Sequence, residues 1–382
     1  MNKAFIIPLR VVSTVQINPR DLKRIFIDFD GTYNSTYNQT GRSKFRSDIE
    51  EMNEGAQVTL EVGSNSDQIQ VFFLFSDIDS VSSSSHITVI LHAIATFSNL
   101  FPKSYSGLKM YISLDDNRRS IETEMSNSQK PCYMSCGLNS NCSHTLSSLQ
   151  SNSKAFNVGG LSNKTDRTII ITRKEEIIKL IFHELIHFAG LDRLLARPNP
   201  DTYGLSVDVK SFILAETFTE TLSIILFTAY QALHIASNEK TDFRYDPMFD
   251  WTYDPMTNRD LFYIMLESEC YYSMFLTVSI LKFYGYDSET YVDFFKGAKK
   301  SNPCPVLVWE YILLRAQLFY SIKELSSLLD PGAEVTDSNV NEIKALMRPT
   351  NAFISSLKEF FILNESPSIT YTLIQIDLER IF

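Results

Sequence analysis

The residues with the clearest chemical meaning are two histidines and a glutamate within residues 181–193, IFHELIHFAGLDR. His183, Glu184 and His187 form the pattern H-E-x-x-H. On an α-helix, positions i and i+4 lie on one face, one turn apart, so both imidazoles can reach one metal ion. Glu184 lies beside such an ion rather than on it, which suits a base acting on water. The pattern predicts a catalytic zinc site and leaves its third protein ligand open.

The sequence around this motif favours a buried metal-binding helix over a chance match. Leu185, Ile186 and Phe188 are uncharged, as a helix in a protein interior requires. EEIIKLIF, which precedes the motif, has the spacing of an amphipathic helix, with acidic residues in its first turn where they favour the helix dipole. Gly190 is typical of a helix C-cap. We therefore expect a helix over residues 174–189.

HELIH, the strand-like RTIIITR before it and the change from β-rich to helical sequence around it resemble the zincin metallopeptidases. In the metzincin branch the motif continues as H-x-x-G-x-x-H and supplies a third histidine. This chain follows that pattern only as far as Gly190. Arg193 stands at the required position and cannot bind a cation, and Asp192 is one position away. A variant that uses Asp192 as the ligand stays open as an alternative.

The gluzincin branch takes its third ligand from a glutamate on a later helix. The apolar stretch FILAETFTETLSIILFTAY contains Glu216 and, one helical turn further, Glu220. Burying an unpaired carboxylate is costly, so two acids in such a stretch need partners. The resemblance implies that Glu216 is the ligand and that Glu220 hydrogen-bonds a ligand histidine. Glu220 replaces the usual Asp, and Ala215 replaces a frequent Asn, so an exchange of roles between the two glutamates stays open.

The resemblance implies a zinc-dependent metallopeptidase with one catalytic Zn²⁺ and a protein or peptide as substrate. Three protein ligands leave one tetrahedral position for water, and Glu184 is expected to take the proton of that water. Such enzymes also use a His, Tyr or Arg from the helical half to stabilise the oxyanion. The candidates for that role are Tyr271, Tyr272, Tyr284, His234 and Arg315, and the sequence does not distinguish among them.

The elements that must position these residues form a β-rich first half. Residues 1–80 are expected to be mainly strand, including RIFIDFD and a hairpin of AQVTLEV and QIQVFFLF. HITVILHAIATF (86–97) suits a buried helix, and LKMYISL (108–114) a strand. Residues 115–166 are rich in Ser, Asn and Gly, and we expect a long loop or insert there, which is a candidate lid.

The second half is expected to be helical, with helices near 207–236, 258–284, 305–329, 339–347 and 351–363 and a strand-like end, SITYTLIQIDL. The fold class is therefore α+β and zincin-like, with the motif at the junction of the two halves. The expected division is an α+β subdomain over 1–190, a helical subdomain with the third ligand over 191–330, and C-terminal helices and a strand over 331–382.

Composition limits the other classes of function. The chain has 382 residues, 44% of them hydrophobic, and a formal net charge of −10. This charge argues against a general nucleic-acid binder. Pro8 and Arg10 interrupt the apolar N-terminus, and no apolar run reaches the length of a membrane span. These features, together with an odd number of cysteines, five, predict an intracellular, cytoplasmic protein in a reducing compartment.

Three other interpretations remain. DFDGT (28–32) resembles the first motif of haloacid-dehalogenase-type phosphatases, with Asp28 as nucleophile and Asp30 as acid, although the hairpin that follows argues against their parallel sheet. CYMSCGLNSNCSH (132–144) could bind a second zinc or hold a disulfide, but free thiols fit its spacing better. Finally, a zincin-like fold could have a structural or binding role in a larger assembly, such as a viral particle.

Overall fold

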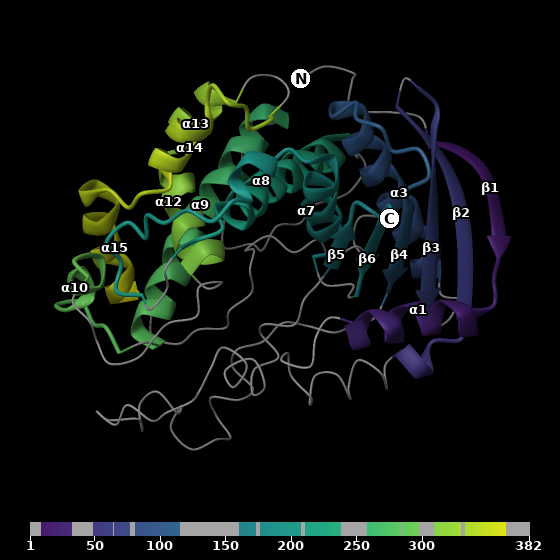
Figure 1. Ribbon diagram of the computed structural model, residues 1–382, viewed down its shortest axis with the longest axis horizontal. Helices are drawn as coiled ribbons and strands as arrows, with labels where there is room; N and C mark the ends of the chain where they lie inside the picture. The colour runs from purple at the N-terminus through teal and green to yellow at the C-terminus, as the bar shows by residue number, and fades with distance from the viewer. Residues whose placement is uncertain are drawn as a thin grey trace, which may run out of the picture.

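The fold combines one mixed β-sheet with a helical half, and Figure 1 shows the sheet at one side and most of the helices at the other. The computed structural model describes residues 9–32, 49–63, 65–76, 81–114, 160–172, 176–207, 211–237, 258–283, 285–297, 309–329 and 333–363. The predicted α+β class is confirmed.

The sheet has six strands in the order β1-β2-β3-β4-β6-β5. The strands are β1 (Arg10–Gln16), β2 (Glu54–Val62), β3 (Asp67–Phe75), β4 (Lys109–Ser113), β5 (Gly160–Asn163) and β6 (Thr168–Ile171). β1, β2 and β3 pair antiparallel, while β3, β4 and β6 run parallel. β5 pairs antiparallel with β6 and forms the edge of the sheet nearest the helical half.

Several strand predictions are confirmed. β2 and β3 form the expected hairpin, in which Val62 pairs with Asp67. The turn between them contains Gly63 at φ 68°, a conformation that costs glycine little. β4 and β6 also lie where the sequence predicted strands.

Two predictions for the first half are wrong. RIFIDFD is not a strand but part of helix α1 (Pro19–Thr32). Leu22 and Phe26, four residues apart, bury one face of this helix against the sheet, which accounts for the helix. The loop predicted over 115–166 is also wrong at its end, because β5 lies there; residues 115–159 lie outside the described residues.

The other described helices include the two predicted for the first half and a helical second half, although the helix expected near 305–329 is divided into a π-helical turn and two short helices. The helices and helical turns are α3 (Val81–Leu100), α7 (Ile177–Ala189), a 3-10 turn (Arg193–Leu195), α8 (Leu214–Ser237), α9 (Asn258–Phe283), α10 (Tyr291–Phe295), a π-helical turn (Trp309–Leu314), α12 (Arg315–Tyr320), α13 (Ile322–Leu328), α14 (Val340–Leu346) and α15 (Asn351–Leu363). The strand predicted for SITYTLIQIDL lies outside the described residues.

Side chains on β3 and β6 alternate between two apolar layers, as the two-residue period of a strand requires. Phe73 and Ile169 face the large core that includes α3 and α7. Leu74 and Ile170 face the opposite layer, which α1 covers. The sheet is therefore covered on both faces, and α7 lies between the sheet and the helical half (Figure 1).

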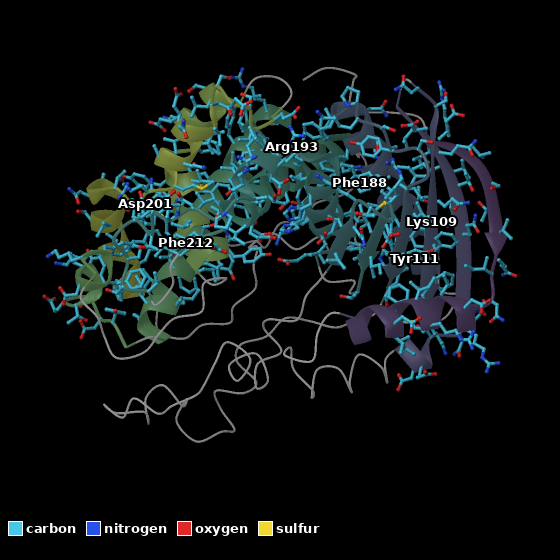
Figure 2. All side chains as sticks on the ribbon, in the orientation of Figure 1. Lys109, Tyr111, Phe188, Arg193, Asp201 and Phe212 are labelled. Carbon is cyan, nitrogen blue, oxygen red and sulfur yellow. The ribbon has the colours of Figure 1, made fainter. Side chains whose placement is uncertain are left out.

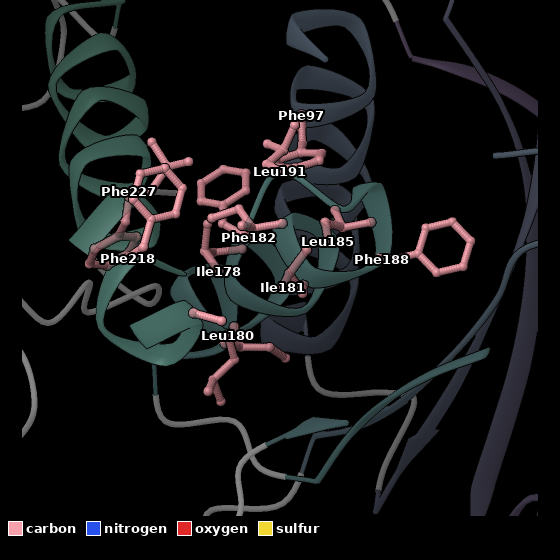
Figure 3. Packing of buried hydrophobic residues seen from close by; sticks show 14 of the residues in the cluster. Phe97, Ile178, Leu180, Ile181, Phe182, Leu185, Phe188, Leu191, Phe218 and Phe227 are labelled. Carbon is pink, nitrogen blue, oxygen red and sulfur yellow. The ribbon is translucent and has the colours of Figure 1, made fainter. Parts of the chain in front are cut away.

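One apolar core joins the sheet to the helices and fixes α7 between them. Phe182 of α7 stacks on Phe97 of α3 at 6.1 Å between ring centroids, and Phe218 and Phe227 of α8 face it from the other side (Figure 3). Phe188 points the opposite way and stacks on Tyr105 at 6.3 Å. Within the described residues, no helix is long and apolar enough to cross a membrane.

Candidate metal centre

Helix α7 presents both histidines of the motif on one face. The ring centroids of His183 and His187 are 4.8 Å apart, and their Nε2 atoms are 3.2 Å apart. Gly190 ends the helix as predicted, at φ 73°, and its N–H donates to the carbonyl oxygens of Ile186 and His187. The C-cap ends the helix one turn after the motif, which lets the chain turn back towards α8.

Helix α8 packs against α7 and brings a carboxylate to the same point. Glu216 Oε2 lies 3.4 Å from Nε2 of His183 and 3.4 Å from Nε2 of His187. Within the described residues, these three side chains form the group of potential ligands close enough to share one ion. The structure thus places Glu216, rather than Glu220, at the shared point.

The spacing of the three donor atoms suits a small metal ion. Bonds of about 2.0–2.1 Å to a tetrahedral metal separate any two ligand atoms by about 1.63 bond lengths, or about 3.3–3.4 Å. The observed separations are 3.2, 3.4 and 3.4 Å. Two imidazole nitrogens and one carboxylate oxygen suit zinc or a similar transition metal better than calcium or magnesium, which prefer oxygen alone. The three residues could therefore hold a metal ion.

A carboxylate behind each histidine fixes which nitrogen faces the shared point. His183 Nδ1 lies 3.1 Å from Glu220 Oε2, and His187 Nδ1 lies 2.6 Å from Asp192 Oδ2. Because an ionised carboxylate only accepts, each Nδ1–H is the donor, and each Nε2 faces the shared point. When both rings are neutral, two Nε2 lone pairs and the Glu216 carboxylate converge on one point, an arrangement that could hold a cation.

Glu220 joins this centre to two buried cations. Its Oε1 accepts from Lys179 Nζ at 2.5 Å and from Arg315 at 3.2 Å. Lys179 also pairs with Glu176 at 3.6 Å, and all four side chains are buried. Burial raises the pKa of Glu220, but Lys179, His183 and Arg315 outweigh that effect and hold it well below its usual range. Glu220 therefore stays ionised and keeps accepting from His183.

Asp192 and Arg193 lie in the segment where the metzincin pattern fails. Asp192 is buried, and its Oδ2 also accepts from Thr219 of α8 at 3.2 Å. It lies on the Nδ1 side of His187, away from the point shared by the Nε2 atoms. Arg193, labelled in Figure 2, is exposed. This segment therefore supports His187 from behind.

Glu184 lies beside these potential ligands in a closely packed setting. Its carboxylate is buried and hydrogen-bonds Ser162 of β5. A Cβ added at Gly160 would lie 2.8 Å from Glu184 Oε1, so the strand and the carboxylate can approach only because this residue is glycine. Burial raises the pKa of Glu184, while His183 and His187 lower it in part. A carboxyl group with a raised pKa suits proton transfer near neutral pH.

Sequence reasoning missed Tyr311, which lies at the centre. Its hydroxyl donates to Glu216 Oε2 at 2.6 Å, and its ring stacks on His183 with centroids 6.2 Å apart. Tyr311 belongs to the π-helical turn, a type of distortion often found at functional sites. Glu310 ties this turn to the start of α8, because its carboxylate accepts from the Ile213 N–H at 2.6 Å.

The candidates named for stabilising an oxyanion lie elsewhere. Arg315 is behind Glu220, and Tyr271 is exposed. His234 packs against His92 of α3, with ring centroids 5.2 Å apart, and Tyr272 lies on α9. Tyr284 lies outside the described residues. The signal that could have found Tyr311 is weak: it lies one helical turn before Arg315 in an apolar stretch.

The electrostatics of the three potential ligands agree with their convergence. Burial lowers the pKa of His187, but hydrogen bonds to Asp192 and Glu216 outweigh burial and raise it well above its usual value. The pKa of His183 is raised in the same way, against burial, by Glu216 and Glu220. Burial raises the pKa of Glu216, yet the two histidines hold it well below its usual range. The carboxylates thus draw positive charge to this point.

The other predicted sites gain no support. Asp28, the candidate phosphatase nucleophile, is exposed on helix α1, where the sequence predicted a strand. Nothing is described for the side chain of Asp30. Residues 132–144, with their three cysteines, and Cys304 lie outside the described residues, and Cys270 is a free thiol on α9.

Comparison with known proteins finds a relative along nearly the whole chain. The sequence is 31% identical over 359 residues to "Uncharacterized protein R210" of Acanthamoeba polyphaga mimivirus, covering 93% of this chain and 84% of that protein. No family model matches the chain, and no solved structure matches it.

Proposed function

We propose that this chain, which belongs to the same family as the mimivirus protein R210, is a zinc-dependent metallopeptidase of the gluzincin type. The observation that carries the proposal is the convergence of His183 Nε2, His187 Nε2 and Glu216 Oε2, with the buried carboxylate of Glu184 beside them. The resemblance of HELIH and ETFTE to gluzincin motifs supports the same function.

The three ligand residues would hold Zn²⁺, which polarises a carbonyl oxygen and lowers the pKa of water when it is bound. Glu184 takes a proton from the attacking water and later passes it to the leaving amine of the peptide bond. Its buried carboxylate lies against β5, beside the three potential ligands, and is therefore placed for both transfers.

Tyr311 is the residue best placed to assist at the carbonyl. Its hydroxyl lies 2.6 Å from Glu216 Oε2 and donates to it. A donor so near the ligand oxygen can turn to the oxygen that gains negative charge during attack on a peptide carbonyl. Glu310 holds the π-helical turn against α8 and so keeps Tyr311 in reach.

A structural or binding role in a larger assembly is the second candidate. The relative is a virus protein, and viruses build large assemblies from their own proteins. The two functions differ at Glu184, because a purely structural site does not need a buried carboxylate with a raised pKa beside its ligands.

Metal analysis and peptide cleavage, measured on the same preparations of the full chain, test the proposal. Wild type should contain about one zinc per chain and cleave members of a peptide library detected by mass spectrometry. His187→Ala should lose both metal and cleavage, whereas Glu184→Gln should keep the metal and lose cleavage. Glu267→Gln, on the exposed face of α9, is the control and should keep both.

The outcomes separate the two functions. Wild-type protein without bound metal contradicts the proposed peptidase. Wild-type protein that binds zinc and cleaves no peptide favours the structural or binding role instead.

A further inference from the structure

The two ligand histidines are supported by carboxylates in different surroundings. Glu220, behind His183, also accepts from Lys179 at 2.5 Å and from Arg315 at 3.2 Å. Within the described residues, the carboxylate of Asp192, behind His187, meets an imidazole and a hydroxyl but no lysine or arginine. Both histidines therefore contact a carboxylate. Among the described residues, the carboxylate behind His183 also pairs with two cations, whereas the one behind His187 pairs with no lysine or arginine.

The negative charge of Glu220 is shared among several groups. Lys179 and Arg315 are both nearly inaccessible to solvent, with side-chain exposures of 2% and 0%. Removing the charge of Glu220 would leave these buried cations without their common counter-ion, which strongly destabilises a fold. Glu220 therefore acts mainly on the stability of the fold.

The negative charge of Asp192 acts mainly on His187. Its contact with Nδ1 is 2.6 Å, against 3.1 Å for the contact of Glu220 with His183. A short, charge-assisted hydrogen bond fixes the ring and increases the electron density that Nε2 offers to a metal. Thr219 of α8 donates to the same oxygen of Asp192, and therefore links the support of His187 to the helix that carries Glu216.

We infer that Asp192 is the positioning residue that sets the affinity of this centre for its metal through His187, with Thr219 holding it in place. Glu220, by contrast, is needed mainly for the stability of the fold. The inference rests on the proposed function only in requiring that the centre binds zinc; it does not require that the centre cleaves peptides.

The test is zinc affinity of the full chain, measured by competition with a chromophoric chelator, together with thermal unfolding of the metal-free protein. Asp192→Ala should weaken zinc binding by about 10–100-fold, the range found when such supporting groups are removed. Asp192→Asn keeps an acceptor oxygen without the charge. Its zinc affinity should lie between those of Asp192→Ala and wild type, and it should unfold near the wild-type temperature. Glu220→Gln should show the larger drop in unfolding temperature.

A matched pair of threonines controls for changes within α8. Thr219 and Thr221 are both fully buried, but only Thr219 contacts Asp192, while Thr221 donates to the Thr217 carbonyl of its own helix. Thr219→Val should weaken zinc binding and Thr221→Val should not. The absorption spectrum of Co²⁺ in place of zinc should change in the Asp192 variants, because the orientation of one ligand ring changes.

The outcomes are distinguishable from those that test the proposed function. If Asp192→Asn and Asp192→Ala both bind zinc as tightly as wild type, the inference is overturned while the metal centre stands. If wild type has no measurable zinc affinity, the proposed function fails and the inference fails with it. Retained zinc affinity with no peptide cleavage contradicts the peptidase alone.

Discussion

Acidification should destabilise the protein through a histidine pair that lies apart from the metal centre. His234 of α8 packs against Tyr230 and His92, with ring centroids 4.3 and 5.2 Å away. His92 Nδ1 lies 3.1 Å from the Tyr230 hydroxyl. Burial lowers the pKa of His234 to about 4, and the neighbouring His92 adds to this effect. Burial also lowers the pKa of His92. The fold therefore favours both imidazoles in their neutral forms.

The sign and size of the effect follow from the pKa of His234. In the unfolded chain this histidine takes up a proton near pH 6.5, whereas in the folded chain it does so only near pH 4. Stability is thus complete above about pH 6.5 and is lost as the pH falls towards about 4. A pKa difference of 2.5 units gives a loss of about 2 kcal/mol at pH 5. Partial exposure of the ring reduces this to about 1 kcal/mol.

Urea unfolding of metal-free protein at about pH 7.5 and about pH 5 measures this effect. Between these two pH values, the free energy of unfolding should fall by about 1 kcal/mol less for His234→Gln than for wild type. His92→Gln should reduce the fall by a smaller amount. Comparing the change with pH, rather than the stability itself, removes the packing lost by each substitution and the titration of the other groups. An equal fall for wild type and His234→Gln would refute the reasoning.

Three further predictions concern the metal centre. Gly160→Ala should place a Cβ 2.8 Å from Glu184 Oε1 and displace that carboxylate; steady-state kinetics should show a kcat lowered by about 10-fold or more with zinc content unchanged. Tyr311→Phe should lower kcat by about 100-fold with little change in KM or zinc content. The control Tyr271→Phe, at an exposed position of α9, should leave kcat, KM and zinc content unchanged. Equal kcat for the two variants would contradict the role of Tyr311. Removing zinc with a chelator should lower the unfolding temperature, because an ion that binds only the folded state stabilises it by about 2.7 kcal/mol when present at 100 times its Kd. If calorimetry finds the same unfolding temperature for metal-loaded and chelator-treated wild type, a metal site that joins α7 to α8 is contradicted.

Local sequence patterns predicted the elements that hold the ligands. The helix with His183 and His187, its C-cap at Gly190 and the β2-β3 hairpin follow from spacing and turn chemistry alone. Glu216 was chosen because the gluzincin resemblance implies a ligand glutamate on a later helix, and because an acid inside an apolar helix needs a partner. Each of these features is visible in a short stretch of the sequence.

The rest depends on contacts between distant segments. Tyr311 lies 95 residues from Glu216 along the chain, and Arg315 lies 95 residues from Glu220, so no local pattern relates them. RIFIDFD alternates like a strand, but Leu22 and Phe26 bury a helical face against the sheet. At that position tertiary packing decided between two patterns that the sequence allowed.

The balance of buried charge at this centre relates metal binding to protonation. The acids around it are Glu176, Glu184, Asp192, Glu216 and Glu220, and the bases paired with them are Lys179 and Arg315. With all five acids ionised and the histidines neutral, as metal binding requires, five negative and two positive charges leave a surplus of three. Without a metal, protons reduce this surplus, because the pKa values of His183, His187 and Glu184 are raised. Such a surplus within one interior is costly unless a cation joins it. A divalent ion at the point shared by His183, His187 and Glu216 would reduce the surplus to one and would compete with protons for the two Nε2 atoms, so metal binding at this centre should release protons.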